Sequence, residues 1–98
     1  MSLTSKITKS ARDKDCNLQI FRYCSHNPEQ TVAAHIHPKG HGHWGMKDND
    51  IFTIRACAVC HDIIDGRKDI GLSSEELDSI KLNGLLLTQI QYINEGLI

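Results

Sequence analysis

Four cysteines in two pairs are the residues of this chain that most directly indicate a chemistry. Cys16 and Cys24 are separated by seven residues, whereas Cys57 and Cys60 form a C-x-x-C pair that is followed at once by His61. Two thiolates on one turn can reach the same ion, and two such pairs complete the tetrahedral S₄ set that Zn²⁺ takes in closed structural sites. The pattern therefore predicts a structural zinc site made by all four cysteines.

The cysteines have three alternatives to zinc: disulfides, a redox pair and c-type haem. The first 12 residues lack the apolar run of a signal peptide, and no stretch approaches the roughly 20 apolar residues of a membrane helix. We therefore expect a cytoplasmic protein without membrane contact, in which disulfides are rare. A thioredoxin-like redox pair, or c-type haem on the C-x-x-C-H motif, would each leave Cys16 and Cys24 without a role.

The histidines indicate a second chemistry, the hydrolysis of a phosphodiester. A neutral imidazole, with a pKa near ~6.5, can take a proton from water at working pH. A divalent ion can stabilise charge on the scissile phosphate and the departing oxygen. These two tasks need two histidines on opposed elements, and His35 and His61 fit them. Taken singly, each would more often be a satisfied polar residue or a surface group.

Local patterns predict the elements that must position these groups. A long helix should begin after the capping box of Ser73 and Glu76 and end near Asn94 or Glu95, before Gly96. The other expected elements are, in chain order, a basic arm or short helix (1–14), a strand or hairpin arm (18–23), a strand (31–36), an exposed loop (38–47), a strand (50–55), and a knuckle running into a short helix (56–64).

A strand, loop, strand and helix, with one histidine on the first strand and one on the helix, is the layout of the ββα-metal, or HNH, nuclease finger. The chain resembles in particular the YbcO-type nucleases of phages and prophages, a compact branch of that superfamily. The matching pieces keep their order along most of the chain: 11–12, Cys16, Cys24, 27–29, Thr31, 34–36, 45–47, Asp50, 56–62, 64–67 and 91–96. The resemblance implies an α+β fold, a small zinc-stapled ββα-metal finger with a long C-terminal helix (73–96), in a single domain over 1–98.

The resemblance also implies roles for individual residues. His35 matches the general base, and His61 matches the helix histidine that holds a catalytic ion of the Mg²⁺ or Mn²⁺ class. The four cysteines, Cys16, Cys24, Cys57 and Cys60, match the structural zinc site.

The acidic ligand of the catalytic ion is less directly matched. Many HNH enzymes have this acid immediately before the base histidine, where this chain has Ala34. Asp50 is expected to replace it, with Asp48 and Asp62 as alternatives. Asn49 is the candidate for the asparagine that orients the base in HNH enzymes.

Two further sets of residues are candidates for substrate contact. Lys47 or Arg67 is expected to help hold the phosphate. His37, His41 and His43 would make an additional metal or phosphate contact, or would merely form a polar loop.

The resulting hypothesis is an endonuclease that cleaves DNA during phage replication or recombination, with phage or host recombination proteins as candidate partners. The alternative is a non-catalytic zinc-binding adaptor for nucleic acid or a recombination protein, which the net charge of −1 favours somewhat because dedicated duplex binders are far more basic. A third reading is a folded nuclease that has lost activity. The sequence leaves open the choice between DNA and RNA, the catalytic ion and the oligomeric state.

Overall fold

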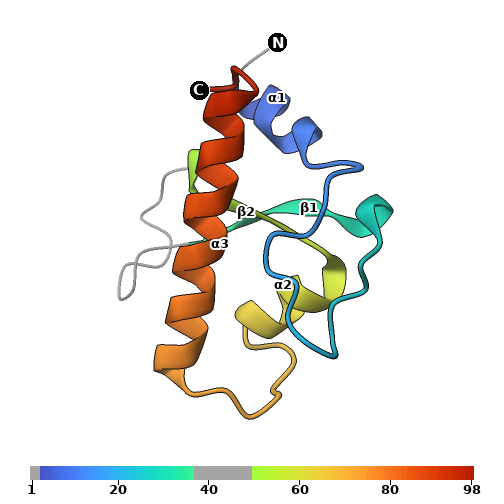
Figure 1. Ribbon diagram of the computed structural model, residues 1–98, viewed down its shortest axis with the longest axis vertical. Coiled ribbons are helices and arrows are strands. Elements are labelled where there is room, and N and C mark those ends of the chain that lie inside the picture. Colours follow the sequence, from blue (N-terminus) through green and yellow to red (C-terminus); the bar gives the residue numbers. More distant parts are fainter. Residues whose placement is uncertain (1–2, 37–49) are drawn as a thin grey trace.

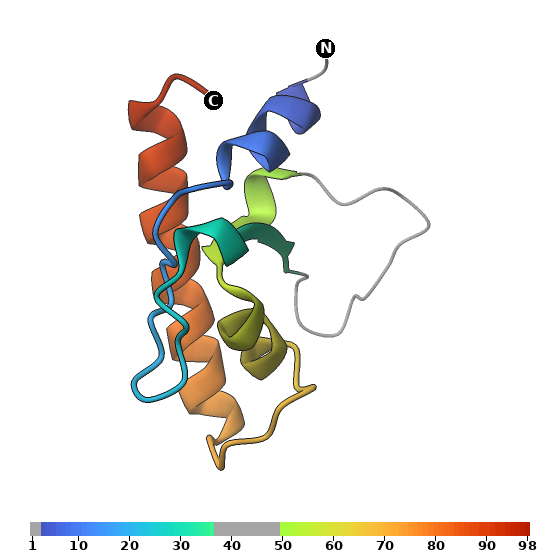
Figure 2. The same cartoon turned by 90° about the vertical axis from the view of Figure 1, so that its right-hand side faces the viewer.

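The computed structural model of the chain describes residues 3–36 and 50–98, with side chains from Lys6 onward. Its elements are the helices α1 (Leu3–Ser10), α2 (Ala58–Ile64) and α3 (Ser74–Asn94), the strands β1 (Val32–His35) and β2 (Thr53–Ala56), and the short 3₁₀ helices η1 (Pro28–Gln30) and η2 (Asp50–Phe52). Figures 1 and 2 show α3 crossing the two strands near its middle, with α1 near its C-terminal end and α2 nearer its N-terminal end. The prediction of a small α+β fold with a long C-terminal helix is confirmed.

The two strands form an antiparallel sheet that ends at the first candidate histidine. Val32 lies opposite Ala56, and His35 lies opposite Thr53. All four residues of β2 are buried, so this strand is covered on both faces. His35 is the last residue of β1, at the edge where the chain leaves the sheet. The register of the sheet therefore fixes the position of His35.

The start and end of α3 follow the sequence signals closely. The Ser73 hydroxyl accepts from the Glu76 N–H (3.1 Å), and the Glu76 carboxylate accepts from the Ser73 N–H (3.0 Å), which completes the predicted capping box. The helix ends at Asn94, and Gly96 follows with a φ of +74°. That left-handed conformation is one that glycine adopts without steric cost.

Small and polar side chains let α3 approach the sheet closely. The fully buried residues of the helix are Gly84, Thr88 and Tyr92. A Cβ atom at Gly84 would lie 2.7 Å from Leu18 Cδ2 and 3.1 Å from Ile54 Cγ2. The glycine therefore sets the distance at which the helix packs over β2.

A buried arginine on β2 anchors the C-terminal half of α3. Arg55 is 1% exposed, and its two Nη atoms each donate to a carboxylate oxygen of Glu95 at 2.7 Å. Arg55 Nη1 also donates to Gln91 (2.9 Å), and the guanidinium lies 5.0 Å from the centre of the Tyr92 ring. Asn17 extends this network, donating to the Arg55 carbonyl and to Gln91. Such a network stabilises a buried charge that would otherwise be costly, and it leaves only Nε of this guanidinium without a hydrogen-bond partner.

The strand or hairpin arm expected over 18–23 is wrong. This segment forms turns, with left-handed φ at Gln19 (42°) and Arg22 (74°), while Phe21 is 84% exposed. Leu18 and Ile20 pack against the buried cysteines instead of alternating across a sheet. The physical reason is that the chain must curl here to bring two cysteines together.

Other expected elements are correct but have different bounds. The arm (1–14) contains the helix α1, and the strand expected over 50–55 begins at Thr53. Asp50–Phe52 form a 3₁₀ turn, and the hydroxyl of the next residue, Thr53, donates to the Asp50 carbonyl (2.6 Å).

The loop (38–47) and the candidates His37, His41, His43, Lys47, Asp48 and Asn49 lie outside the described residues. Among the helices that are described, none is long and apolar enough to cross a membrane.

Candidate active site and metal centre

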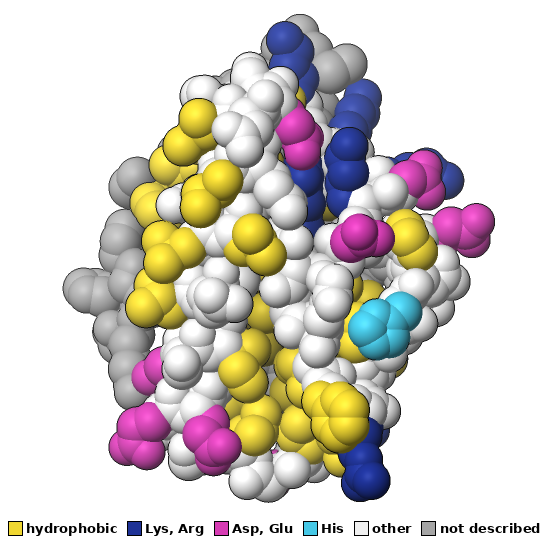
Figure 3. All heavy atoms as spheres, in the orientation of Figure 1, with side chains coloured by type: hydrophobic (Ala, Val, Ile, Leu, Met, Phe, Trp, Pro, Cys, Tyr) yellow, Lys and Arg dark blue, Asp and Glu magenta, His cyan; other side chains and the backbone are white. Residues whose placement is uncertain are grey.

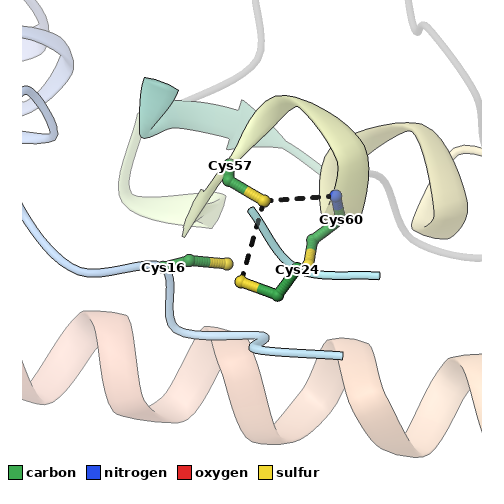
Figure 4. Close-up of side chains that lie close together, drawn as sticks. All are labelled: Cys16, Cys24, Cys57 and Cys60. Carbon is green, nitrogen blue, oxygen red and sulfur yellow. Dashed lines mark hydrogen bonds between the residues drawn. The ribbon is translucent and has the colours of Figure 1, made fainter. Parts of the chain in front are cut away.

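The two cysteine pairs, which lie far apart in the sequence, meet at one point in the fold (Figure 4). Cys57 and Cys60 come from the start of α2, and Cys16 and Cys24 come from the loop between α1 and η1. Their four sulfur atoms all lie within 4.8 Å of one another. Three of the cysteines are buried and Cys24 is half-buried. The predicted cluster is therefore present, and it could hold a metal ion.

The spacing of the sulfurs fits a tetrahedral ion. Zn–S bonds of about 2.3 Å in a tetrahedron require sulfur–sulfur distances of about 3.8 Å. The Cys24 and Cys57 sulfurs lie 3.9 Å apart. A set of four thiols without an open position suits structural Zn²⁺ more than a hard cation such as Mg²⁺.

Backbone N–H groups stabilise negative charge on three of the sulfurs. The N–H groups of Gln19, His26 and Cys60 donate to the sulfurs of Cys16, Cys24 and Cys57, each at 3.4 Å. Gln19 and His26 adopt left-handed φ values of 42° and 53°, which are rare for residues other than glycine. The loop thus accepts backbone strain in order to direct its N–H groups at the cysteines.

The four thiols differ in pKa, as expected for neighbouring groups that share protons. A hydrogen bond from Cys60 lowers the pKa of the Cys16 thiol to about 4. The same bond, together with burial, raises the pKa of Cys60. Burial also raises the pKa of Cys24. A bound metal requires every ligand thiol to lose its proton, so binding here would displace protons into solvent.

A second centre lies at the end of β1, where His35 meets Asp50. His35 Nε2 lies 2.6 Å from Asp50 Oδ1, and the Thr8 hydroxyl donates to the other carboxylate oxygen (2.7 Å). Asp50 is 3% exposed, whereas the His35 side chain is 37% exposed. With Asp50 ionised, His35 Nε2 carries the hydrogen and Nδ1 keeps a lone pair. The arrangement orients the imidazole and leaves a basic nitrogen available.

A second histidine–carboxylate pair lies on α2. His61 Nε2 is 3.1 Å from Asp65 Oδ2, one helical turn further on. Arg67 Nη2 donates to the same carboxylate oxygen (2.8 Å), and Arg67 Nη1 lies 3.6 Å from Asp62. Both His61 and Asp65 are partly exposed, so the pair is accessible to solvent and to a ligand.

One pocket connects the two pairs. It has a volume of about 340 Å³ and is lined by His35, Ile36, Ile64, Asp65, Asp78, Lys81, Leu82 and Leu85. His35 and Asp65 thus share a pocket, and Asp65 is the residue that contacts His61. The remaining lining comes largely from the N-terminal half of α3, including Lys81.

The structure divides the predicted site residues between these places. The four cysteines form one cluster, His35 and Asp50 form one pair, and His61 lies beside Asp65. The Asp50 carboxylate contacts His35 and Thr8, and Arg67 is mostly exposed near Asp62 and Asp65. Lys47 lies outside the described residues.

Asp65 is the site residue that was missed in the sequence. Its signal was the i, i+4 spacing from His61, which places two side chains on one face of a helix. The acids expected in this role were Asp50, Asp48 and Asp62. Lys81 and Asp78 were also missed, because only tertiary packing brings α3 to the pocket.

The comparisons with known proteins agree on one family. The sequence matches the family described as "Putative nuclease YbcO" over residues 5–97. Curated relatives with that name from Escherichia coli K12 and Enterobacteria phage 82 are each 37% identical over 95 residues, covering 94% of this chain and 95% of the relative. A solved structure, titled as a putative bacteriophage protein from Escherichia coli K-12, is 32% identical with a TM-score of 0.73, covering 92% of this chain and 99% of that one. The chain belongs to the YbcO family, which carries that description.

Proposed function

We propose that this chain is a metal-dependent endonuclease that hydrolyses DNA phosphodiester bonds in a ββα-metal site, within one domain spanning 1–98. The observation that carries the proposal is the pocket shared by His35 and Asp65, each of which belongs to a histidine–carboxylate pair. The phage origin of one relative supports a role in phage DNA replication or recombination in the bacterial cytoplasm.

His35 is the general base. Asp50 accepts a hydrogen bond from Nε2–H and so selects the tautomer in which Nδ1 can take a proton from water. Because Asp50 is buried and also held by Thr8, the imidazole does not need to reorient during the reaction. Asp50 therefore takes the orienting role in place of the metal-ligand role expected for it.

His61 and Asp65 would hold the catalytic ion. Two adjacent ligands of an octahedral ion with bonds of about 2.1 Å should lie about 3.0 Å apart, and His61 Nε2 and Asp65 Oδ2 are 3.1 Å apart. Nitrogen and oxygen donors with space for water or phosphate suit a Mg²⁺- or Mn²⁺-class ion. When bound, this ion supplies stabilisation of negative charge on the departing oxygen.

Cationic side chains around the pocket position the phosphate. Lys81 lines the pocket from α3, and Arg67 lies beside Asp65. Guanidinium and ammonium groups both bind phosphate oxygens through charge-assisted hydrogen bonds. Lys47 remains a further candidate for this contact.

The direct test is cleavage of plasmid and single-stranded DNA by zinc-replete protein, with and without Mg²⁺ or Mn²⁺. We expect cleavage that requires the added ion and that disappears in His35→Ala, whose zinc content and circular dichroism should match wild type. His26→Asn is the matched control, because asparagine tolerates the left-handed backbone at this exposed histidine. Full activity in His35→Ala would overturn the assignment.

The second candidate is a zinc-binding adaptor that binds nucleic acid or a recombination protein without cleaving. The net charge of −1 and the two acids in the pocket, Asp65 and Asp78, favour it. It predicts retention of DNA in a binding assay, with no products after prolonged incubation with either ion. The same experiment therefore separates the two candidates.

A further inference from the structure

The side of α3 that faces solvent carries an apolar stripe. Residues 82–94 form a thirteen-residue stretch without Lys, Arg, Asp or Glu. Within it, four large aliphatic side chains are each 51–60% exposed: Leu82, Leu86, Ile90 and Ile93, together called the α3 stripe. Figure 3 shows hydrophobic side chains following α3 along the left of the molecule. Exposed apolar groups gathered in this way commonly mark an interaction surface.

The stripe points away from the core of its own protomer. At about 100° per residue, its four side chains fall within an arc of about 80° on the helix. The buried residues Gly84, Thr88 and Tyr92 are centred about 155° from that arc. A helix that is apolar on two nearly opposite sides is typically covered on both.

The surface extends beyond the helix to its neighbour η2. Gln89 donates to the Ile51 carbonyl (2.8 Å), which holds η2 against α3, and the next residue, Phe52, is 47% exposed. The stripe is about 16 Å long at 1.5 Å per residue and about 10 Å wide, the width of a helix. It can therefore supply the apolar centre of an interface of about 800 Å² per partner, with uncharged residues such as Asn83 and Asn94 at its rim.

We propose that the α3 stripe is the interface of a homodimer, in which the α3 helices of two copies pack antiparallel about a two-fold axis. An isologous interface must match itself after rotation, and the four positions are nearly symmetric about their centre. Leu82 then faces Ile93 of the partner subunit, and Leu86 faces Ile90 of the partner subunit. The axis passes near the level of Thr88.

The chemistry of the stripe favours a second copy over other occupants. The uncharged segment creates no like-charge repulsion when it meets itself. A nucleic acid would need Lys or Arg for its phosphates, and an interfacial lipid-binding helix would need basic residues on its flanks. Residues 82–94 contain no Lys or Arg, and the two residues that flank this stretch are a single basic one, Lys81, and the acidic Glu95. The test of this proposal does not depend on the nuclease activity, because its readout is the oligomeric state. Of the four stripe residues, Leu82 also lines the pocket.

Sedimentation velocity of the full zinc-replete chain over a range of concentrations tests the dimer. We expect a species of twice the 11.0 kDa protomer mass. Leu86→Glu and Ile90→Lys should each raise the dimer dissociation constant by more than about tenfold. Leu87→Glu is the matched control, because Leu87 is 41% exposed on the same helix but lies about 60° outside the arc. Its dissociation constant should stay near wild type.

Mixing the two disruptive variants tests the antiparallel register. In that register the Leu86→Glu carboxylate of one copy meets the Ile90→Lys ammonium of the other, so the mixture should form heterodimers although each variant alone is monomeric. A monomeric wild-type protein at all concentrations would overturn the proposal. So would dimers that survive both substitutions, or a mixture that stays monomeric while each variant remains folded by circular dichroism.

Discussion

Replacing Glu95 by glutamine should measure how firmly the C-terminal half of α3 is held to the sheet. Glu95 accepts two hydrogen bonds of 2.7 Å from Arg55, which is 1% exposed. Hydrogen bonds to charged groups contribute about 1.5–3 kcal/mol each. Glu95 is itself one-third exposed, and glutamine keeps one acceptor oxygen, so solvent screening reduces the loss. We expect Glu95→Gln to lower the free energy of unfolding by about 1.5 kcal/mol, or Tm by about 6–12 °C for a domain of this size.

The pH dependence of this loss provides a second, independent check. Hydrogen bonding from Arg55 lowers the pKa of Glu95 in the folded protein below its ordinary value. A carboxyl whose folded pKa is depressed stabilises the protein above the unfolded pKa and loses that contribution as the pH falls through the folded pKa. The difference between wild type and Glu95→Gln should therefore be full at neutral pH and begin to close below about pH 5.

The assay is urea and thermal unfolding of both proteins in buffer with excess zinc, from neutral pH down to about pH 4. Glu75→Gln serves as a control, because it makes the same chemical change at an exposed position in the first turn of α3. The reasoning is refuted by a Glu95→Gln protein whose Tm stays within about 2 °C of wild type. A deficit that is as large at low pH as at neutral pH would also refute it.

Three further predictions concern the site and its supports. Asp50→Asn should reduce the rate of DNA cleavage by about 10²–10⁴-fold. The asparagine amide would donate to His35 Nε2, so the imidazole hydrogen would move to Nδ1 and that nitrogen could no longer act as a base. A cleavage rate close to that of wild type would contradict this. Removal of zinc by a chelator, or the substitution Cys57→Ser, should abolish cooperative unfolding, since structural zinc contributes about 10–16 kcal/mol in small domains. Metal analysis of the untreated protein should find one zinc ion per chain. Ser73→Ala should cost about 0.5–2 kcal/mol in urea unfolding through loss of the Glu76 capping bond, and an unchanged midpoint would show that the cap is unimportant.

The sequence predicted best the features that depend on local chemistry. The capping box at Ser73, the end of α3 before Gly96 and the strand carrying His35 each rest on a few adjacent residues, and all are present. The meeting of the four cysteines was also predicted, because metal-ligand spacing has few other uses in a small chain. Short-range patterns of this kind predict local structure independently of the tertiary fold.

The failures come from features that tertiary structure decides. The segment 18–23 has the composition of a strand, but its cysteines bend it into turns with left-handed residues such as Gln19 and Arg22. Nothing in the sequence indicated that Arg55 is buried, because the groups that bind it, Glu95 and Gln91, lie about 40 residues away in the chain. No local pattern reports a partner at that separation.

The structural cysteine cluster and the proposed catalytic residues are mechanically connected. Cys60 and His61 are adjacent on the first turns of α2, so the cluster that fixes Cys60 also fixes the direction of His61. On the other side, Cys57 follows β2 directly, and the register of β2 with β1 sets the position of His35. The distance between the two histidines therefore depends on a short path of backbone through the cluster, while α3 closes the pocket from outside. It follows that loss of the cluster should abolish cleavage together with the fold that positions His61, even though no cysteine belongs to the proposed reaction centre.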